Sequence, residues 1–306
     1  MPKDNHDAVK PPPMTLADVL ADMEAAQSEP IELSELPPIY AADEIRRTPR
    51  TQPLPDLSGL VKLWQLIGEG NTGKTVVARY LIEKLIAHDK QGQSVMAALA
   101  PGSRNLADFA PGVVQPPAAD PRATAAWATA RLAAMQKLRW GGIWDFGGGD
   151  MALRLMVEAQ PDMPERVEQE GMAIVAAYLF SPRLDDLAFL KTYERLGYRP
   201  RATALILNLG KADSPSAYND IRRQPEYKAA LDRGAVELWL PPLTQRVALA
   251  IEKARVLFAQ ARDGIVPDGK RPADISAIER VAVREWLMRT EAEFADIERA
   301  GWMPWT

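Results

Sequence analysis

Cysteine is absent from the chain, and histidine occurs only as His6 and His88. Without cysteine the protein can form no disulfide, thiolate metal site or thiol nucleophile. His6 lies in a polar terminal stretch and His88 directly follows a helix-like run, so we expect both to be solvated surface residues. These absences exclude most cysteine-based and histidine-based chemistry, and they are compatible with a reducing cytoplasm.

Long apolar runs are also missing. No stretch approaches the ~18 to 20 apolar residues that span a bilayer, and the N-terminus lacks the apolar core of a signal peptide. The formal net charge of −4 is uneven, because residues 1–56 carry 5 Lys/Arg against 11 Asp/Glu and the rest carries 32 against 30. This near-neutral body gives no support for DNA binding. Acidic residues outnumber arginines in residues 274–298, which disfavours an anionic membrane surface. We therefore expect a cytoplasmic protein with no membrane association.

Proline clusters in the first part of the chain and divides it into three regions. Residues 1–56 are predicted to form an acidic, largely extended or disordered arm, with one amphipathic helix over residues 15–27. Residues 57–262 are predicted to form one domain, and residues 263–306 a linker and a C-terminal helix packed on it. A disordered tail and a partner-binding segment are both open for the arm.

From residue 60, apolar runs alternate with helix-like stretches, which predicts an α/β fold with a parallel twisted sheet and helices on both faces. The expected strands are residues 60–67, 94–100, 140–144, 172–180, 202–208 and 235–240. The expected helices are residues 76–87, 122–138, 151–160, 184–198, 225–232, 244–261 and 273–300, and residues 161–171 are expected to be a polar connection.

One stretch joins the first strand to the first helix: Gly68-Glu69-Gly70-Asn71-Thr72-Gly73-Lys74-Thr75. It fits the phosphate-loop pattern G-x-x-x-x-G-K-[ST] in full. Its glycines allow a tight turn whose N–H groups face a phosphate, and the positive end of the next helix adds to the attraction. The pattern predicts that residues 68–75 bind a nucleotide, that Lys74 reaches the β- and γ-phosphates, and that Thr75 holds Mg²⁺. A glycine-rich turn without a ligand is the alternative.

Asp145 ends the third strand-like run and begins a D-x-x-G pattern that ends at Gly148. In this pattern the carboxylate holds Mg²⁺ through water and the Gly148 N–H donates to the γ-phosphate. Lys74, Asp145 and Gly148 are therefore the candidate catalytic groups, and Thr75 and Asp145 the candidate metal ligands. Asp150 could orient water, but a helix cap explains it as well.

The order of these motifs resembles the ParA/MinD group of P-loop ATPases, including plasmid-partition and conjugation-associated members. The resemblance spans about residues 60–262 and includes strands ending at Ser181-Pro182, at Asn208 and at Pro241-Pro242. It implies a P-loop NTPase fold that binds ATP and Mg²⁺, with Asn208 on the adenine edge and the Pro241-Pro242 loop closing over the base. It also implies a nucleotide-dependent homodimer. A strand cap is the other interpretation of Asn208.

Two departures from this family weaken the expected hydrolysis. The family's loop usually carries a lysine after its first glycine, whereas this chain has Glu69. The second strand usually ends in acidic residues, whereas the matching run here is Ala98-Leu99-Ala100-Pro101. Loss of one transition-state donor lowers rates by ~10² to 10³, so we expect slow turnover. Arg104 is the candidate replacement for the missing lysine.

The sequence thus predicts an ATP-binding switch whose slow, Mg²⁺-dependent hydrolysis controls dimerisation or binding of a protein partner, in plasmid partition or DNA transfer. The arm or the C-terminal helix would contact that partner. The alternative is a hydrolysis-deficient ATP-binding scaffold. A small-molecule kinase or ligase would need an acceptor pocket, which the sequence does not identify.

Overall fold

The structure is a computed structural model that describes residues 45, 47–50, 52–88, 92–99, 106–147, 151–270 and 272–306. All of these residues belong to one compact unit, Pro38–Thr306. The helix predicted over residues 15–27 lies outside the described residues.

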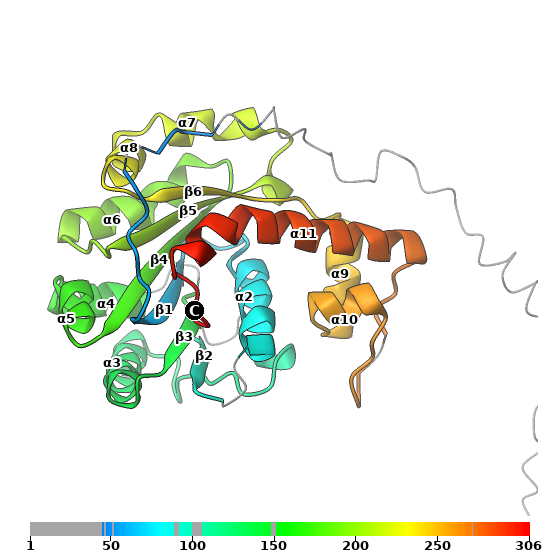
Figure 1. Cartoon of the computed structure of the whole chain (residues 1–306), viewed down its shortest axis with the longest axis horizontal. Coiled ribbons are helices and arrows are strands. Elements are labelled where there is room, and N and C mark those ends of the chain that lie inside the picture. Colours follow the sequence, from blue (N-terminus) through cyan, green and yellow to red (C-terminus); the bar gives the residue numbers. More distant parts are fainter. Residues whose placement is uncertain are drawn as a thin grey trace, which may run out of the picture. The chain divides into compact units, whose positions relative to one another are not determined.

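Six parallel strands form one sheet in the order β2-β3-β1-β4-β5-β6 (Figure 1). The strands are β1 (Val61–Ile67), β2 (Ser94–Ala98), β3 (Gly141–Asp145), β4 (Met172–Phe180), β5 (Ala202–Asn208) and β6 (Val236–Leu240). Each one lies where the sequence predicts a strand. The predicted α/β class with a parallel sheet is therefore confirmed.

The central strands are almost wholly apolar because both of their faces are covered. All nine residues of β4 are buried, as expected for a strand in the middle of a parallel sheet. The register places Leu66 of β1 beside Asp145 of β3 and Ala177 of β4. The carboxyl ends of these three strands therefore meet at one edge of the sheet.

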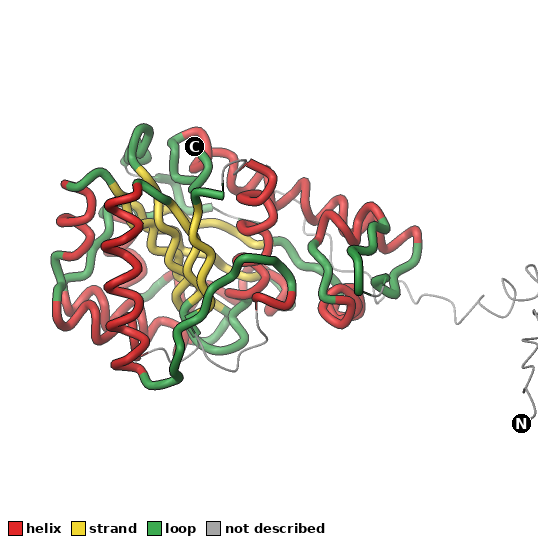
Figure 2. The backbone as a smooth tube through the Cα atoms, turned by 90° about the horizontal axis from the view of Figure 1, so that it is seen from below, coloured by secondary structure: helices red, strands yellow, loops and turns green. Residues whose placement is uncertain are grey.

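Helices form a layer on each face of the sheet (Figure 2). One core packs α2, α9, α10 and α11 against the sheet, and a second core packs α3 to α8 against the other face. The bounds are α2 (Lys74–His88), α3 (Pro121–Leu138), α4 (Met151–Ala159), α5 (Met163–Gln169), α6 (Ala188–Leu196), α7 (Asn219–Arg222), α8 (Pro225–Asp232), α9 (Gln245–Ala254), α10 (Phe258–Asp263) and α11 (Ala277–Arg299). The connection from β1 to β2 runs across the sheet in one direction, and all later crossovers run in the other. Right-handed crossovers therefore place α2 on one face and the later crossover helices, α3 to α8, on the other.

Two helix predictions were wrong. Residues 161–171 contain α5, which buries Met163 and Val167 against the sheet, so the segment is more than a polar connection. The helix predicted over residues 244–261 is two helices, because Arg255 adopts a left-handed conformation (φ 55°) and ends α9. Because a non-glycine residue makes this break, no glycine signals it in the sequence.

The end of the arm packs against the edge strand β6 and against α11. Both terminal guanidinium nitrogens of Arg47 donate to the Glu293 carboxylate, each at 2.6 Å. The backbone N–H and the hydroxyl of Thr48 donate to the carboxylate of Glu237 in β6, whose side chain is 4% exposed. The N–H of Leu57 donates to the carbonyl of Ala300 at 3.0 Å. These contacts join the arm, β6 and the C-terminal helix.

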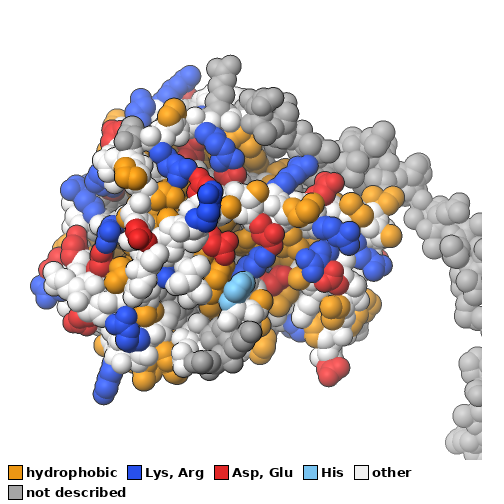
Figure 3. Space-filling view, in the orientation of Figure 1, with side chains coloured by type: hydrophobic (Ala, Val, Ile, Leu, Met, Phe, Trp, Pro, Cys, Tyr) orange, Lys and Arg blue, Asp and Glu red, His pale blue; other side chains and the backbone are white. Residues whose placement is uncertain are grey.

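Among the described residues, no helix combines the length and the hydropathy that a membrane crossing requires. On the face drawn in Figure 3, basic and acidic side chains lie interspersed over α11 and its neighbours. This mixture agrees with the near-neutral charge of the body.

Candidate functional site

The phosphate-loop stretch lies at the point where the chain reverses direction across the sheet. β1 and β3 are neighbours, but α2 leaves β1 on one face while α4 follows β3 on the other. Ligands of open α/β sheets bind at such switch points, outside the carboxyl ends of the strands. Residues 68–75 and Asp145 both lie at this edge.

Two glycines of the loop are required by close neighbours. Gly68 has φ 151°, and a Cβ there would lie 2.7 Å from the carbonyl oxygen of Leu179. Gly73 has φ 102°, and its Cβ would lie 2.3 Å from Nδ2 of Asn208. A Cβ on Gly70 would meet nothing within 4 Å. The backbone therefore has the tight, side-chain-free conformation that a phosphate cradle needs.

Lys74 is the first residue of α2, and its side chain folds back across the loop. Its Nζ donates to the carbonyl oxygens of Gly68 and Glu69, each at 2.7 Å. The hydroxyl of Thr72 also donates to the Glu69 carbonyl, at 3.0 Å. The ammonium group is largely buried and lies inside the curve of the loop, where an anion would pair with it.

Thr75 and Asp145, the two predicted metal ligands, lie together. Thr75 Oγ1 is 3.5 Å from Asp145 Oδ2. Asp145 is fixed at the end of β3 because its carbonyl accepts from the N–H of Leu99 at 2.9 Å. A hydroxyl and a single carboxylate fit Mg²⁺, which completes its shell with phosphate oxygens and water. In the described part of the chain, no group of three or more His, Cys, Asp or Glu residues is placed so that it could hold a metal ion.

The start of α2 provides the helix end that the motif requires. The carbonyl of Gly73 accepts from the N–H groups of Val76 and Val77, at 3.0 and 3.2 Å, so the helix winds directly out of the loop. α2 is 15 residues long, and no acidic residue lies in its first turn. Its N-terminus therefore adds a positive potential to that of Lys74.

Asn208 ties the end of β5 to the loop. Its Nδ2 donates to the carbonyl of Thr72 at 2.9 Å, and its Oδ1 accepts from the N–H of Gly210 at 3.0 Å. The second bond is the cap that the sequence offers as an alternative role. The first bond was not anticipated, because residues 72 and 208 are far apart in the chain. The signal for it was Gly73, the position where Asn208 excludes a side chain.

Pro241 and Pro242 follow β6 directly and lie close to the loop. Leu240, the last residue of β6, would be 3.9 Å from a Cβ on Gly73. Pro241 is buried and Pro242 is partly exposed. The carbonyl of Pro241 accepts from the indole N–H of Trp286 in α11 at 2.9 Å. The structure thus brings the predicted base loop beside the predicted phosphate loop.

The second strand supplies no carboxylate at this edge within the described residues. Ala98 and Leu99 are buried, and Glu69 is partly exposed. Three further candidates, Arg104, Gly148 and Asp150, lie outside the described residues. The geometry of their roles therefore stays a prediction.

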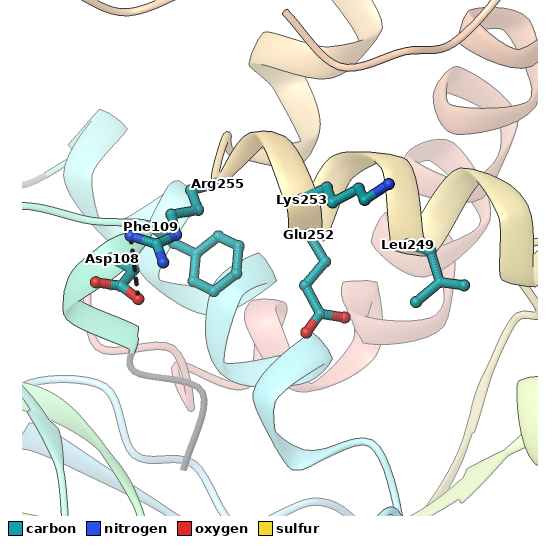
Figure 4. A pocket seen from close by; sticks show the side chains of 6 residues that line it. All are labelled: Asp108, Phe109, Leu249, Glu252, Lys253 and Arg255. Carbon is teal, nitrogen blue, oxygen red and sulfur yellow. Dashed lines mark ion pairs between the residues drawn. The ribbon is translucent and has the colours of Figure 1, made fainter. Parts of the chain in front are cut away.

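A separate cleft of about 350 Å³ lies between α9 and the short helix η3 (Leu106–Asp108) (Figure 4). Its walls include Phe109, Leu249 and the ion pair between Arg255 and Asp108, with 3.7 Å between nitrogen and oxygen. The buried Arg79 of α2 stacks on Phe109, one of the residues that line the cleft, and burial lowers the pKa of Arg79 to about 10. Arg79 is therefore still charged at neutral pH, and it anchors the segment that follows β2.

No family model matches the chain, and no curated protein matches it.

Proposed function

We propose that the protein is a ParA/MinD-like P-loop protein that binds Mg²⁺ and ATP at residues 68–75. The observation that carries this proposal is the meeting of Thr75 and Asp145, 3.5 Å apart, at the start of the helix that follows a complete phosphate-loop pattern. A glycine-rich turn without a ligand does not require a hydroxyl, a carboxylate and a buried lysine around the same stretch of backbone.

The chain's own groups would act mainly by binding and orienting the triphosphate. The N–H groups of the loop and the N-terminus of α2 attract the β-phosphate. Lys74 can exchange its bonds to the Gly68 and Glu69 carbonyls for contacts with phosphate oxygens, which moves its charge only within the loop. Asn208 holds the loop in this shape before the ligand arrives, so little ordering remains to be done on binding.

Mg²⁺ would be held by Thr75 and Asp145, and when bound it would neutralise charge on the phosphate oxygens. At positions where the family has groups that assist the attack of water, this chain has other residues. Ala98 and Ala100 stand where the family has acidic residues, and Glu69 adds a negative charge beside the loop. We therefore propose slow hydrolysis that resets a binding switch.

The same observations favour a second candidate, an ATP-binding scaffold without turnover. Nucleotide binding depends on Lys74, Thr75 and the loop backbone, all of which are present. Hydrolysis depends on groups that β2 does not supply among the residues that the structure describes. The two candidates share one site and differ only in the fate of the γ-phosphate.

Phosphate release and nucleotide binding, measured on the same protein, separate these candidates. A switch releases phosphate at a low rate that Lys74→Ala abolishes, whereas a scaffold binds ATP tightly and releases none. Lys84→Ala is the matched control, because Lys84 lies on the same helix and forms an ion pair with Glu291. Unchanged ATP binding in Lys74→Ala would contradict both candidates.

As a switch, the protein would form an ATP-dependent homodimer in the cytoplasm and would contact a protein partner through the arm or α11. Light scattering with and without Mg²⁺ and ATP measures whether the protein forms this homodimer. A mass that doubles with ATP and not with ADP is expected for the switch. A mass that is independent of nucleotide would contradict nucleotide-controlled dimerisation.

A further inference from the structure

The C-terminal helix reaches the candidate nucleotide site through one buried hydrogen bond. Trp286, in the middle of α11, donates its indole N–H to the carbonyl of Pro241 at 2.9 Å. Trp286 is 3% exposed, so the bond is shielded from water and its loss would leave a buried polar group without its partner. α11 therefore does more than cover the sheet, because it holds the backbone that follows β6.

The indole ring is fixed from two sides. The ring of Phe258 lies 4.6 Å from it, centroid to centroid, and the ring of Tyr80 meets it nearly edge-on at 6.3 Å. Tyr80 belongs to α2, the helix that begins with Lys74. Trp286 thus contacts the helix of the phosphate loop and the Pro241 carbonyl at the same time.

The loop after β6 begins with two residues that have no backbone hydrogen-bond donor. Pro241 and Pro242 have no backbone N–H, so neither can donate a hydrogen bond to a neighbouring element. Their carbonyl groups are the only backbone groups through which these two residues can be anchored. Trp286 supplies the donor for the first of them.

We propose that Trp286 is a positioning residue that sets the base-contacting conformation of the Pro241-Pro242 loop. The inference rests on the proposed function, because it assumes that this loop faces the base of a nucleotide held at residues 68–75. Trp286 touches the loop and not the ligand. Its removal therefore weakens the part of binding that depends on the base and leaves the part that depends on the phosphates.

The test compares two tryptophan variants that lose the same group. Trp286→Phe keeps an aromatic ring and removes the N–H. Trp64→Phe is the matched control, because Trp64 is also buried and donates its indole N–H to a backbone carbonyl, that of Trp302, at 2.7 Å. Titration calorimetry with Mg²⁺ then measures the Kd of ATP and of inorganic tripolyphosphate for each protein.

We expect Trp286→Phe to bind ATP about tenfold more weakly, the effect of one buried hydrogen bond, and to bind tripolyphosphate as the wild type does. Trp64→Phe should change neither Kd by more than about twofold. Equal weakening of both ligands, or of neither, in Trp286→Phe would overturn the positioning role and leave the proposed function intact. A wild-type chain that binds neither ligand would overturn both proposals.

Discussion

Replacing Asn208 by alanine distinguishes a structural tie from a contact with the base. In the structure Asn208 is 5% exposed, and its side-chain amide donates to the carbonyl of Thr72 at 2.9 Å and accepts from the N–H of Gly210 at 3.0 Å. Alanine removes both bonds and leaves the carbonyl of the buried Thr72 and the N–H of the exposed Gly210 without these partners. The loss of one buried partner destabilises a protein by about 1–3 kcal/mol. Because water can replace the partner of the Gly210 N–H, we expect about 1–3 kcal/mol in total.

The phosphate loop would also lose the tie that holds Thr72. Because the loop must then be ordered by the ligand, the affinity for ATP and for tripolyphosphate should fall by the same factor, about tenfold. If Asn208 instead contacted the adenine edge, ATP alone would bind more weakly. The ratio of the two dissociation constants therefore distinguishes the roles.

Thermal unfolding and titration of both ligands provide the measurement. A destabilisation of this size lowers Tm by about 2–12 °C in a domain of this length. Asn208→Asp is the informative second variant, because it keeps the acceptor for Gly210 and removes the donor to Thr72. An Asn208→Ala protein with unchanged Tm and unchanged tripolyphosphate affinity would refute the tie.

Three further predictions follow from named contacts. Gly73→Ala should destabilise the fold by about 3 kcal/mol or prevent folding, because residue 73 has a left-handed conformation and the new Cβ would lie 2.3 Å from Nδ2 of Asn208. Gly70→Ala is the control and should leave the Tm unchanged. Equal effects of the two variants in chemical unfolding would contradict this prediction. Glu69→Lys should raise phosphate release by tenfold or more through added transition-state charge, and an unchanged rate would show that Glu69 does not limit turnover. Glu237→Gln should lower the free energy of unfolding by about 2–3 kcal/mol, because this buried carboxylate accepts from several donors. Arg47→Ala, at an exposed ion pair, should lower it by about 1 kcal/mol or less. Similar decreases of Tm in the two variants would contradict this difference.

The sheet was predictable because its strands are buried on both faces. β4 reads as one apolar run of nine residues, so its place in the sequence needs no knowledge of its neighbours. The tight turn at residues 68–75 was predictable for a similar reason, since the glycines that it requires lie within the turn itself. Lys74, Thr75 and the glycines all occur within eight residues of one turn.

The missed features depend on residues that are distant in sequence. The bond from Asn208 to Thr72 and the bond from Trp286 to Pro241 each join two elements whose proximity appears only after folding. The end of α9 at Arg255 was missed because a left-handed arginine gives no signal of its own. The contact of Thr48 with Glu237 was missed because the proline-rich composition of the arm says nothing about which surface it meets.

A crystal structure of the wild-type chain with Mg²⁺ and a non-hydrolysable ATP analogue would show directly whether residues 68–75 bind a nucleotide. We expect a triphosphate bound by residues 68–75, with Lys74 in contact with its phosphate oxygens and the metal beside Thr75 and Asp145. Crystals grown at saturating ligand in which this loop holds no nucleotide, or in which the nucleotide binds elsewhere, would contradict it.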